Sequence, residues 1–452
     1  MENTRENKMG TMPINKLLLS LSLPMVASML VQALYNIVDS VFVSMYNADA
    51  FTAVSLAFPL QNLMIAFATG TGVGINALLS KSLGEKNFER ANKAANNGIF
   101  ISLVHYVIFL LIGIFGVKAF FSAQSSDLDV IAYGIDYASV CLIGSIGVFT
   151  QITTERLLLA TGKSVLSMAT QLSGAIINLI MDPILIFGFG PIPEMGAMGA
   201  ALATVLGQIF AAFMGIYFNR RYNKEIHVTF RSFKPDMAVI KRIYAVGLPS
   251  TVMASITSVM TFGINKILTS FPSIVNDAQS VFGAYYKLQS FIFMPIFGLN
   301  NGMVPIIAYN YGAKKPDRMK KTITLAIVYA MSIMLIGLLA FTLIPHILLG
   351  FFNTNLVLGV PAFRAISLSF IFAGFCIITG SVLQAVGNGF LSMCTSIVRQ
   401  LVVLLPAAYL LSLSGNINLV WYSFPIAEIA SLFMSMVFLR HIFKTIINPL
   451  YK

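Results

Sequence analysis

The sequence predicts an all-α polytopic membrane protein with twelve transmembrane helices in two six-helix lobes. Three observations support this fold class. The chain is 57% hydrophobic and only 10% charged, whereas soluble proteins usually carry about 25% charged residues. Its apolar runs reach the roughly 20 residues that a helix needs to cross a bilayer. Its second half repeats motifs of its first half, so that each half supplies one lobe.

Twelve apolar runs are long enough for one transmembrane helix each. The first run has no small-residue cleavage site and is longer than the apolar core of a signal peptide, so we expect it to remain in the mature protein. In chain order the runs are 16–45, 51–80, 94–117, 130–154, 164–190, 196–218, 240–270, 279–311, 322–349, 357–386, 391–413 and 417–439.

Positive charge is distributed unevenly between the two sides of these helices. With the N-terminus inside, the cytoplasmic segments hold 24 of the 29 Lys and Arg residues, and the outside loops hold only Lys118. This is the positive-inside pattern, so the net charge of +12 needs no nucleic acid to explain it. We expect a multi-pass protein with both termini in the cytoplasm.

The two halves repeat one design. When the second half is laid over the first, Pro24 matches Pro249 and 158–163 matches 383–388. A slightly longer offset matches 84–90 with 312–318. Because six helices is an even number, both halves have the same orientation in the membrane, and parallel repeats of this kind suit alternating access.

The repeat divides the chain into an N-terminal six-helix lobe (1–218), a cytoplasmic linker (219–239) and a C-terminal six-helix lobe (240–452). The linker is strongly basic. It is either a simple solvated connector or a segment that also touches anionic lipid of the inner leaflet.

Two carboxylates, Asp39 and Asp182, stand alone in stretches with no other charge, 17–48 and 164–193. A charge in hydrocarbon costs at least ~2.5 kcal/mol, so an intramembrane Asp marks a functional site. Counted from the cytoplasmic ends of their helices, both lie in the outer half of the membrane and can meet inside one bundle. We predict that they handle a cation; the alternative is a structural hydrogen bond between helices.

The helix of Asp39 carries further polar residues. Tyr35 stands one turn before Asp39 and can donate a hydrogen bond to it. Pro24 removes a backbone hydrogen bond and permits a kink, either one that responds to the charge of Asp39 or a static one. The other polar residues near Asp39 on this helix are Gln32 and Asn36.

Asn178 lies four residues before Asp182 and therefore shares its helix face. The two residues offer a carbonyl and a carboxylate to the same point, although Asn178 is as well explained by a structural hydrogen bond. Tyr137 lies in the outer part of the fourth helix and is a candidate hydrogen-bond donor to the site. Two carboxylates in a low-dielectric site repel each other, so we expect them to titrate as a coupled pair.

The repeat does not extend to these carboxylates. The alignment that matches Pro24 with Pro249 places Asp39 over Ile264 and Asp182 over Ala407. The second lobe instead carries Arg399 and Glu428, which we expect to pair because buried charges need partners. The four histidines are scattered, and no metal-binding His motif lies on a helix, so we expect no catalytic residue and no cofactor.

Several segments together match the pattern of a known family: 23–25, Gly84 and Arg90, 160–162, 178–188 and 196–204. In them the sequence resembles the multidrug and toxic compound extrusion (MATE) family over nearly its whole length, and specifically the family's prokaryotic multidrug-export branch. The resemblance implies two six-helix lobes around a V-shaped cavity and export of organic cations in exchange for H+ or Na+.

The resemblance also assigns residues, each by its own position in this chain. The residues that resemble the cation ligands of that branch, for H+ or for Na+, are Asp39, Asn178, Asp182 and Thr204. The residues that resemble its supporting network are Gln32, Tyr35 and Tyr137. Other branches use acidic residues of the C-terminal lobe, where this chain has Ile264 and Ala407.

We therefore expect an antiporter, coupled to H+ or Na+, that exports lipophilic and often cationic drugs and toxic compounds across a prokaryotic cell membrane. We expect it to contact membrane lipid, to act as a monomer, and to need no cofactor and no nucleic acid. The alternative is a lipid-linked oligosaccharide flippase of related fold, which needs a basic central cavity. Four basic residues of the second lobe keep that alternative open: Lys266, Lys287, Arg364 and Arg399.

Overall fold

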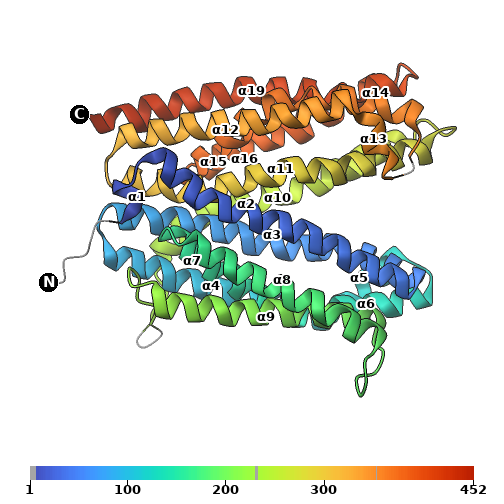
Figure 1. The fold of residues 1–452 in the computed structure, drawn as a ribbon, viewed down its shortest axis with the longest axis horizontal. Helices are drawn as coiled ribbons and strands as arrows, with labels where there is room; N and C mark the ends of the chain where they lie inside the picture. Colours follow the sequence, from blue (N-terminus) through green and yellow to red (C-terminus); the bar gives the residue numbers. More distant parts are fainter. Residues whose placement is uncertain (1–6, 230–232, 353, 452) are drawn as a thin grey trace. The chain divides into compact units, whose positions relative to one another are not determined.

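A computed structural model describes residues 7–229, 233–352 and 354–451 of the chain. Within these ranges the structure is helical, with no strand beyond an isolated bridge between Phe189 and Ile192 (Figure 1). Among the described residues, ten helices are long and apolar enough to cross a membrane, or up to twelve if each of two bent helix pairs is one span. The predicted all-α membrane fold is confirmed.

The helices of the first half coincide with the first six predicted spans. Side-chain caps begin several of them: Asn47 accepts from the backbone N–H of Asp49, and Asn87 from that of Arg90. The helices are α1 (Lys8–Thr11), α2 (Ile14–Tyr46), α3 (Ala48–Gly84), α4 (Phe88–Phe115), α5 (Val117–Gln124), α6 (Leu128–Ile143), α7 (Ile146–Ala160), α8 (Ser164–Phe187) and α9 (Gly196–Tyr222).

The helices of the second half follow the same plan, with more breaks. They are α10 (Met237–Leu268), α11 (Val275–Gly312), α12 (Pro316–Leu343), α13 (Pro345–Gly350), α14 (Leu356–Ser367), α15 (Phe370–Ala385), α16 (Gly389–Ile397), the π-helix η1 (Val398–Leu404), α17 (Leu405–Ser412), α18 (Ile417–Val420) and α19 (Ser423–Ile442). Two short segments, the π-helix η2 (Phe443–Ile447) and the 3₁₀-helix η3 (Asn448–Tyr451), end the described chain.

Two predicted spans, the fourth and the tenth, are broken. α6 and α7 meet at an angle of 43°, and α14 and α15 meet at 48°. The first break falls at Gly144, where an added Cβ would lie 2.5 Å from a methyl group of Val205 on α9. Glycine is therefore needed there for close approach of α9. Both breaks occur in the fourth span of their half, so the bend belongs to the repeated design.

The chain packs as two compact units. Ala27–Thr251 forms one, here called the N-unit, and Val252–Lys452 together with Met1–Val26 forms the other, the C-unit. The two boundaries fall inside α2 and α10, shortly after Pro24 and Pro249. α2 and α10 thus each contribute to both units, at positions related by the sequence repeat. The lobe boundaries at 218 and 240, which count spans along the chain, stay a prediction.

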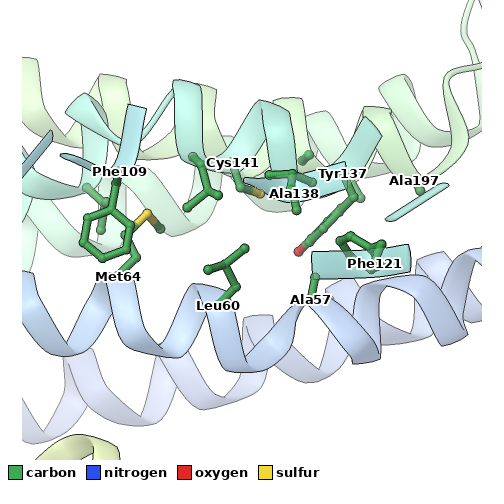
Figure 2. Packing of buried hydrophobic residues seen from close by; sticks show 14 of the residues in the cluster. Ala57, Leu60, Met64, Phe109, Phe121, Tyr137, Ala138, Cys141 and Ala197 are labelled. Carbon is green, nitrogen blue, oxygen red and sulfur yellow. The ribbon is translucent and has the colours of Figure 1, made fainter. Parts of the chain in front are cut away.

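Part of the apolar core of the N-unit lies between α3 and α6. Figure 2 shows Leu60 and Met64 of α3 beneath Cys141, Ala138 and Tyr137 of α6. All five side chains are buried. Tyr137 lies along this interface with its hydroxyl directed toward α3. The core therefore holds the hydroxyl of Tyr137 in a defined orientation.

α8 and α9 lie side by side in the N-unit (Figure 1) and approach closely through two glycines. An added Cβ on Gly174 would lie 2.9 Å from the carbonyl oxygen of Gly207, and one on Gly207 would lie 2.6 Å from the carbonyl oxygen of Gly174. Small residues let membrane helices pack backbone to backbone. This contact fixes the register in which Asn178 of α8 faces Thr204 of α9.

Candidate cation site

Three of the predicted site residues meet at the α8–α9 interface. Asp182 is fully buried at 0% exposure, and Asn178 is 4% exposed. The amide nitrogen Nδ2 of Asn178 donates to Oδ1 of Asp182 and to Oγ1 of Thr204, both at 3.3 Å. The spacing of four residues thus places Asn178 and Asp182 on one face, as expected, and α9 adds the hydroxyl.

Asp39 reaches the same point from α2. Its carboxyl group is close enough to that of Asp182 for the two groups to interact electrostatically. Two ionised carboxylates repel each other, so a proton or another cation favours their close approach. Tyr35 and Tyr137 are close enough to both carboxylates to interact with them electrostatically.

The cluster contains three buried oxygen atoms without a hydrogen-bond partner: Oδ1 of Asp39, Oδ1 of Asn178 and Oδ2 of Asp182. Buried polar atoms are normally satisfied, and an unsatisfied one costs free energy. A proton or a hard cation, which prefers oxygen ligands, would satisfy them. Among the described residues no group of three or more His, Cys, Asp and Glu side chains could hold a metal ion. The oxygen atoms of the two carboxylates and of Asn178 nevertheless form a donor set that fits H+ or Na+.

A series of hydrogen bonds joins α2 to α8 on the N-terminal side of Asp39 and Asp182. Nε2 of Gln171 donates to Oε1 of Gln32 at 2.5 Å, and the hydroxyl of Ser28 donates to Oε1 of Gln171. Gln32 is in turn close enough to Tyr35 for the two side chains to interact. Ser28, Gln32, Tyr35 and Asp39 recur at intervals of three and four residues, so they share one face of α2. Sequence reasoning missed Ser28 and Gln171.

Tyr137 is supported by a glutamine that sequence reasoning also missed. Nε2 of Gln61 donates to the Tyr137 hydroxyl at 3.0 Å and lies 3.4 Å from the sulfur of Cys141. The direction of the Tyr137 side chain is visible in Figure 2. The sequence contained no signal for this contact, because the partner lies on a different helix 76 residues away.

Two predicted residues lie outside the cluster. Asn36 is exposed, and its backbone carbonyl accepts from the Ser40 hydroxyl of its own helix at 2.9 Å. Pro24 lies in the part of α2 that belongs to the C-unit. α2 continues through Pro24 as one helix of 33 residues. Neither residue contributes an atom to the cluster of buried oxygens.

The basic residues of the second half do not gather. Arg399, in η1, pairs with Glu428 of α19 at 2.9 Å, which confirms the expected ion pair. Lys287 lies over the ring of Phe352, 5.8 Å from its centroid. Nε of Arg364 donates to the carbonyl of Thr342 at 3.3 Å. Lys287 and Arg364 are exposed, as is Lys266.

Comparison with known proteins agrees with this architecture. The chain is 29% identical over 429 residues to the "Multidrug export protein MepA" of Staphylococcus haemolyticus (strain JCSC1435), covering 94% of this chain and 92% of that protein. It is 26% identical over 421 residues to the protein of the same name from Staphylococcus aureus (strain MRSA252), covering 92% and 91%.

Solved structures share the fold. One is described as "Outward-facing conformation of a multidrug resistance MATE family transporter of the MOP superfamily"; it superposes with a TM-score of 0.92 at 24% identity over the full length of both chains. Another is a MOP superfamily transporter from Pyrococcus furiosus, with a TM-score of 0.91 at 23% identity over the full length of both chains.

The MatE family matches the sequence twice, over residues 24–184 and 249–410. The two matches begin at Pro24 and Pro249, so they independently reproduce the internal repeat. Together they cover more than half of the chain. With its repeated helical architecture and its similarity to multidrug export proteins, the chain belongs to the MatE family of multidrug export transporters.

Proposed function

We propose that the chain is a cation-coupled antiporter that exports lipophilic, often cationic, drugs across the cell membrane. The observation that carries this proposal is the set of three unsatisfied buried oxygens on Asp39, Asn178 and Asp182. Such a set is unfavourable in the membrane when empty. It becomes favourable when an H+ or Na+ neutralises it, and a gradient of that ion can then drive the cycle.

Coupling follows if the ion and the drug compete for the same negative charge. A ligand shifts a conformational equilibrium only by its different affinity for the two states. The ion stabilises the state in which Asp39 is held against Asp182, and α2 carries Asp39. A cationic drug stabilises the state in which the carboxylates are free to attract it. The two ligands therefore weaken each other's binding by the same factor.

The transport cycle proposed here involves no enzymatic step and no cofactor besides the coupling ion. Its partners are small organic cations, lipophilic drugs and membrane lipid, with the monomer as the working unit. The glycine contact between α8 and α9 and the hydrogen bonds from Gln171 supply a fixed framework inside the N-unit. Within that framework the carboxylates exchange one positively charged partner for another.

The proposed orientation places both termini in the cytoplasm of a prokaryotic cell, because the basic segments collect on that side. A cysteine in place of Ser126, between α5 and α6, should react from outside with an impermeant maleimide. A cysteine in place of Lys224, after α9, should react only in opened cells. Both positions are exposed. Reversed labelling would overturn the orientation and the direction of export.

A lipid-linked oligosaccharide flippase is not favoured. Such a protein needs clustered positive charge for the pyrophosphate. Here Arg399 is paired with Glu428, and Lys266, Lys287 and Arg364 are exposed. The described basic residues therefore leave no unneutralised cluster within the membrane spans of the C-unit.

Dye efflux from intact cells tests the proposal. Cells expressing the chain should extrude a lipophilic cationic dye faster than vector controls, and collapse of the ion gradient should abolish the difference. In parallel, the chain should fail to rescue a flippase-deficient strain. Rescue of that strain without dye efflux would overturn the proposed function.

A further inference from the structure

A second charged site of the N-unit lies away from the carboxylates, where α4 and α10 begin. It is a cavity of about 260 Å³ lined by the first turns of both helices. Its charged lining residues are Glu89, Arg90 and Lys93 of α4, together with Asp236 and Arg242 at the start of α10. All belong to the N-unit.

The two acidic residues are already engaged. Glu89 pairs with Lys93 at 2.9 Å. One oxygen of Asp236 caps α10 by accepting from the backbone N–H groups of Ala238 and Val239, at 3.0 and 3.2 Å, and the other lies 3.9 Å from Lys93. Among the described residues Arg242 makes no ion pair. Arg90 is paired with Glu85, so Arg242 supplies the surplus positive charge of the cavity, and Lys81 is near enough for both arginines to influence it electrostatically.

The first turns of α4 and α10 add to this charge. The first four backbone N–H groups of a helix lack partners within it, and the helix dipole makes that end positive. α4 has 28 residues and α10 has 32, so both are long enough for a full effect. Asn87 caps α4 and Asp236 caps α10, so the two helix ends add only their remaining dipole to the charge of the surplus Arg242.

The repeat allows the basic loop before α4 to be compared with the corresponding loop before α12. The loop before α12 has the same geometry as the loop before α4: Lys86 and Lys314, which the repeat aligns, have φ values of 56° and 54°. Nε of Arg90 donates to Ser82 at 2.9 Å, and Nε of Arg318 donates to Asn310 at 3.0 Å. The two arginines therefore occupy equivalent positions.

Their remaining donors differ. In the C-unit, Nη2 of Arg318 donates to the backbone carbonyls of Met9 and Met12, at 2.9 and 2.7 Å, and Nζ of Lys315 donates to the carbonyl of Gly10 at 3.0 Å. α1 and the residue after it thus supply oxygen acceptors to that basic loop. In the N-unit, Arg90 binds Ser82 and Glu85, and none of the described backbone carbonyls accepts from it. The carboxylate of Glu85 thus takes the place of the α1 carbonyls at Nη2 of Arg90, and a cavity lies beside this arginine.

We propose that this cavity binds a phosphate group, most directly the phosphate of an anionic phospholipid. Phosphate oxygens would supply Arg242 with acceptors, while Arg90, whose Nη2 is held by Glu85, adds positive charge to the cavity wall. α4 and α10 are both candidate membrane spans, so their first turns lie where a lipid headgroup lies. Dissolved inorganic phosphate has the same chemistry and is the other source.

The test uses the purified full-length protein and two probes. A fluorescent phosphatidylglycerol, compared with the matched phosphatidylcholine, reports lipid binding, and inorganic phosphate alone reports the free anion. The wild type should prefer phosphatidylglycerol. Arg242→Gln should weaken that binding roughly fivefold, whereas Arg242→Lys should largely preserve it. Arg242 is exposed and unpaired within the described structure, so its variants should fold, which a thermal melt checks.

Lys241→Gln is the matched control, because Lys241 is exposed on the same helix turn but does not line the cavity. It should leave phosphatidylglycerol binding within about twofold. If inorganic phosphate binds with the same dependence on Arg242 and the lipid shows no preference, the phosphate comes from solution. Equal losses in Lys241→Gln and Arg242→Gln, or no loss in either, would overturn the site.

Discussion

Corresponding helices of the two halves carry buried polar groups, but these groups find their hydrogen-bond and charge partners in different ways. In the N-unit, Asp39, Asn178 and Asp182 leave buried oxygens without partners. In the C-unit, Glu428 receives a guanidinium from Arg399 at 2.9 Å, although its second oxygen stays unpaired. A cation built into the chain thus neutralises the carboxylate of one half, whereas the buried carboxylates of the other half have no such built-in counterion among the described residues.

Buried positions show that these helices correspond. Laying α19 over α9 matches the buried small residues of the two helices, and it places Glu428 opposite Thr204. The matched pairs are Gly199 with Ser423, Ala203 with Ala427, Gly207 with Ser431 and Ala211 with Ser435. The hydroxyl of Thr204, which accepts a hydrogen bond from Asn178 in one half, is therefore replaced by the carboxylate of Glu428 in the other half.

α8 corresponds to the continuous helical segment of α16, η1 and α17, which contains one extra residue. At the start of the two segments, the buried residues Ser164, Ser167 and Thr170 match the buried residues Gly389, Ser392 and Thr395. Further along, Asn178 and Asp182 match the buried residues Leu404 and Ala408 only when the offset between the halves is lengthened by a single position. The π-helix η1 lies between and accommodates one extra residue. Asp182 therefore corresponds to Ala408, and not to Ala407 as a uniform offset gives. Neither alanine is charged, so the asymmetry remains.

The difference between the halves suggests a structural role for the charged groups of the C-unit and a transport role for those of the N-unit. A buried ion pair is complete in itself, and removing one partner leaves an uncompensated charge. Carboxylates without a fixed counterion must instead gain and lose one. On this view the N-unit exchanges cations, whereas the Arg399–Glu428 pair holds helices together.

The largest effect should come from neutralising a carboxylate of the N-unit. Asp182→Asn or Asp39→Asn should reduce coupled efflux at least about tenfold, because the coupling between ion and drug depends on these charges. Expression and membrane insertion should persist, because a neutral amide is easier to bury. Dye efflux normalised to protein level measures the effect.

Asp136→Asn is the control for that change. Asp136 is adjacent to Tyr137 on α6 but exposed, so its variant should transport normally. Efflux at wild-type rates in Asp39→Asn or Asp182→Asn would remove these residues from the mechanism.

Breaking the C-unit pair should mainly affect stability. Glu428→Gln leaves Arg399 without its partner, and with side-chain exposures of 11% and 23% the pair is partly shielded from solvent. We expect a loss of about 2 kcal/mol, below the value for fully buried pairs. Thermal unfolding in detergent measures it, and efflux per folded protein should fall less than in Asp182→Asn.

A double replacement sharpens that result. Arg399→Met with Glu428→Leu removes both charges and should recover most of the lost stability. A larger transport defect in Glu428→Gln than in Asp182→Asn would move the coupling site to the C-unit.

The smallest effects should come from the neutral ligands. Asn178→Ala should raise the ion concentration for half-maximal efflux roughly tenfold, since it removes a donor to Asp182 and a free carbonyl. Thr204→Val should raise it roughly threefold. Thr69→Val is the control, because the Thr69 hydroxyl bonds only within α3. Unchanged ion dependence in Asn178→Ala would exclude this amide from the site.

The sequence predicts the parts of this site that depend on local periodicity. Twelve apolar runs coincide with the helical spans, and the spacing of Asn178 and Asp182 places them on one face of α8. The Arg399–Glu428 pair was predictable because two opposite charges at membrane depth need each other.

Contacts set by helix packing were not predictable. The bend after α6 depends on Val205 of another helix, and the reach of Gln171 to Gln32 depends on the register of α2 against α8. Gln61 and Tyr137 meet for the same reason. The π-helix displaces the repeat by a single position, a change that one sequence alone does not show. Asn36 has a suitable side chain but lies on the exposed side of α2.

Dye binding measured against ion concentration tests the central claim most directly. Calorimetry or fluorescence on purified protein, across pH and with or without Na+, gives the affinity for a cationic dye. We predict that H+ or Na+ weakens dye binding in the wild type and in Glu428→Gln, that dye weakens ion binding by the same factor, and that Asp182→Asn removes this dependence. Dye affinity independent of both ions in the wild type, or an undiminished dependence in Asp182→Asn, would contradict the account.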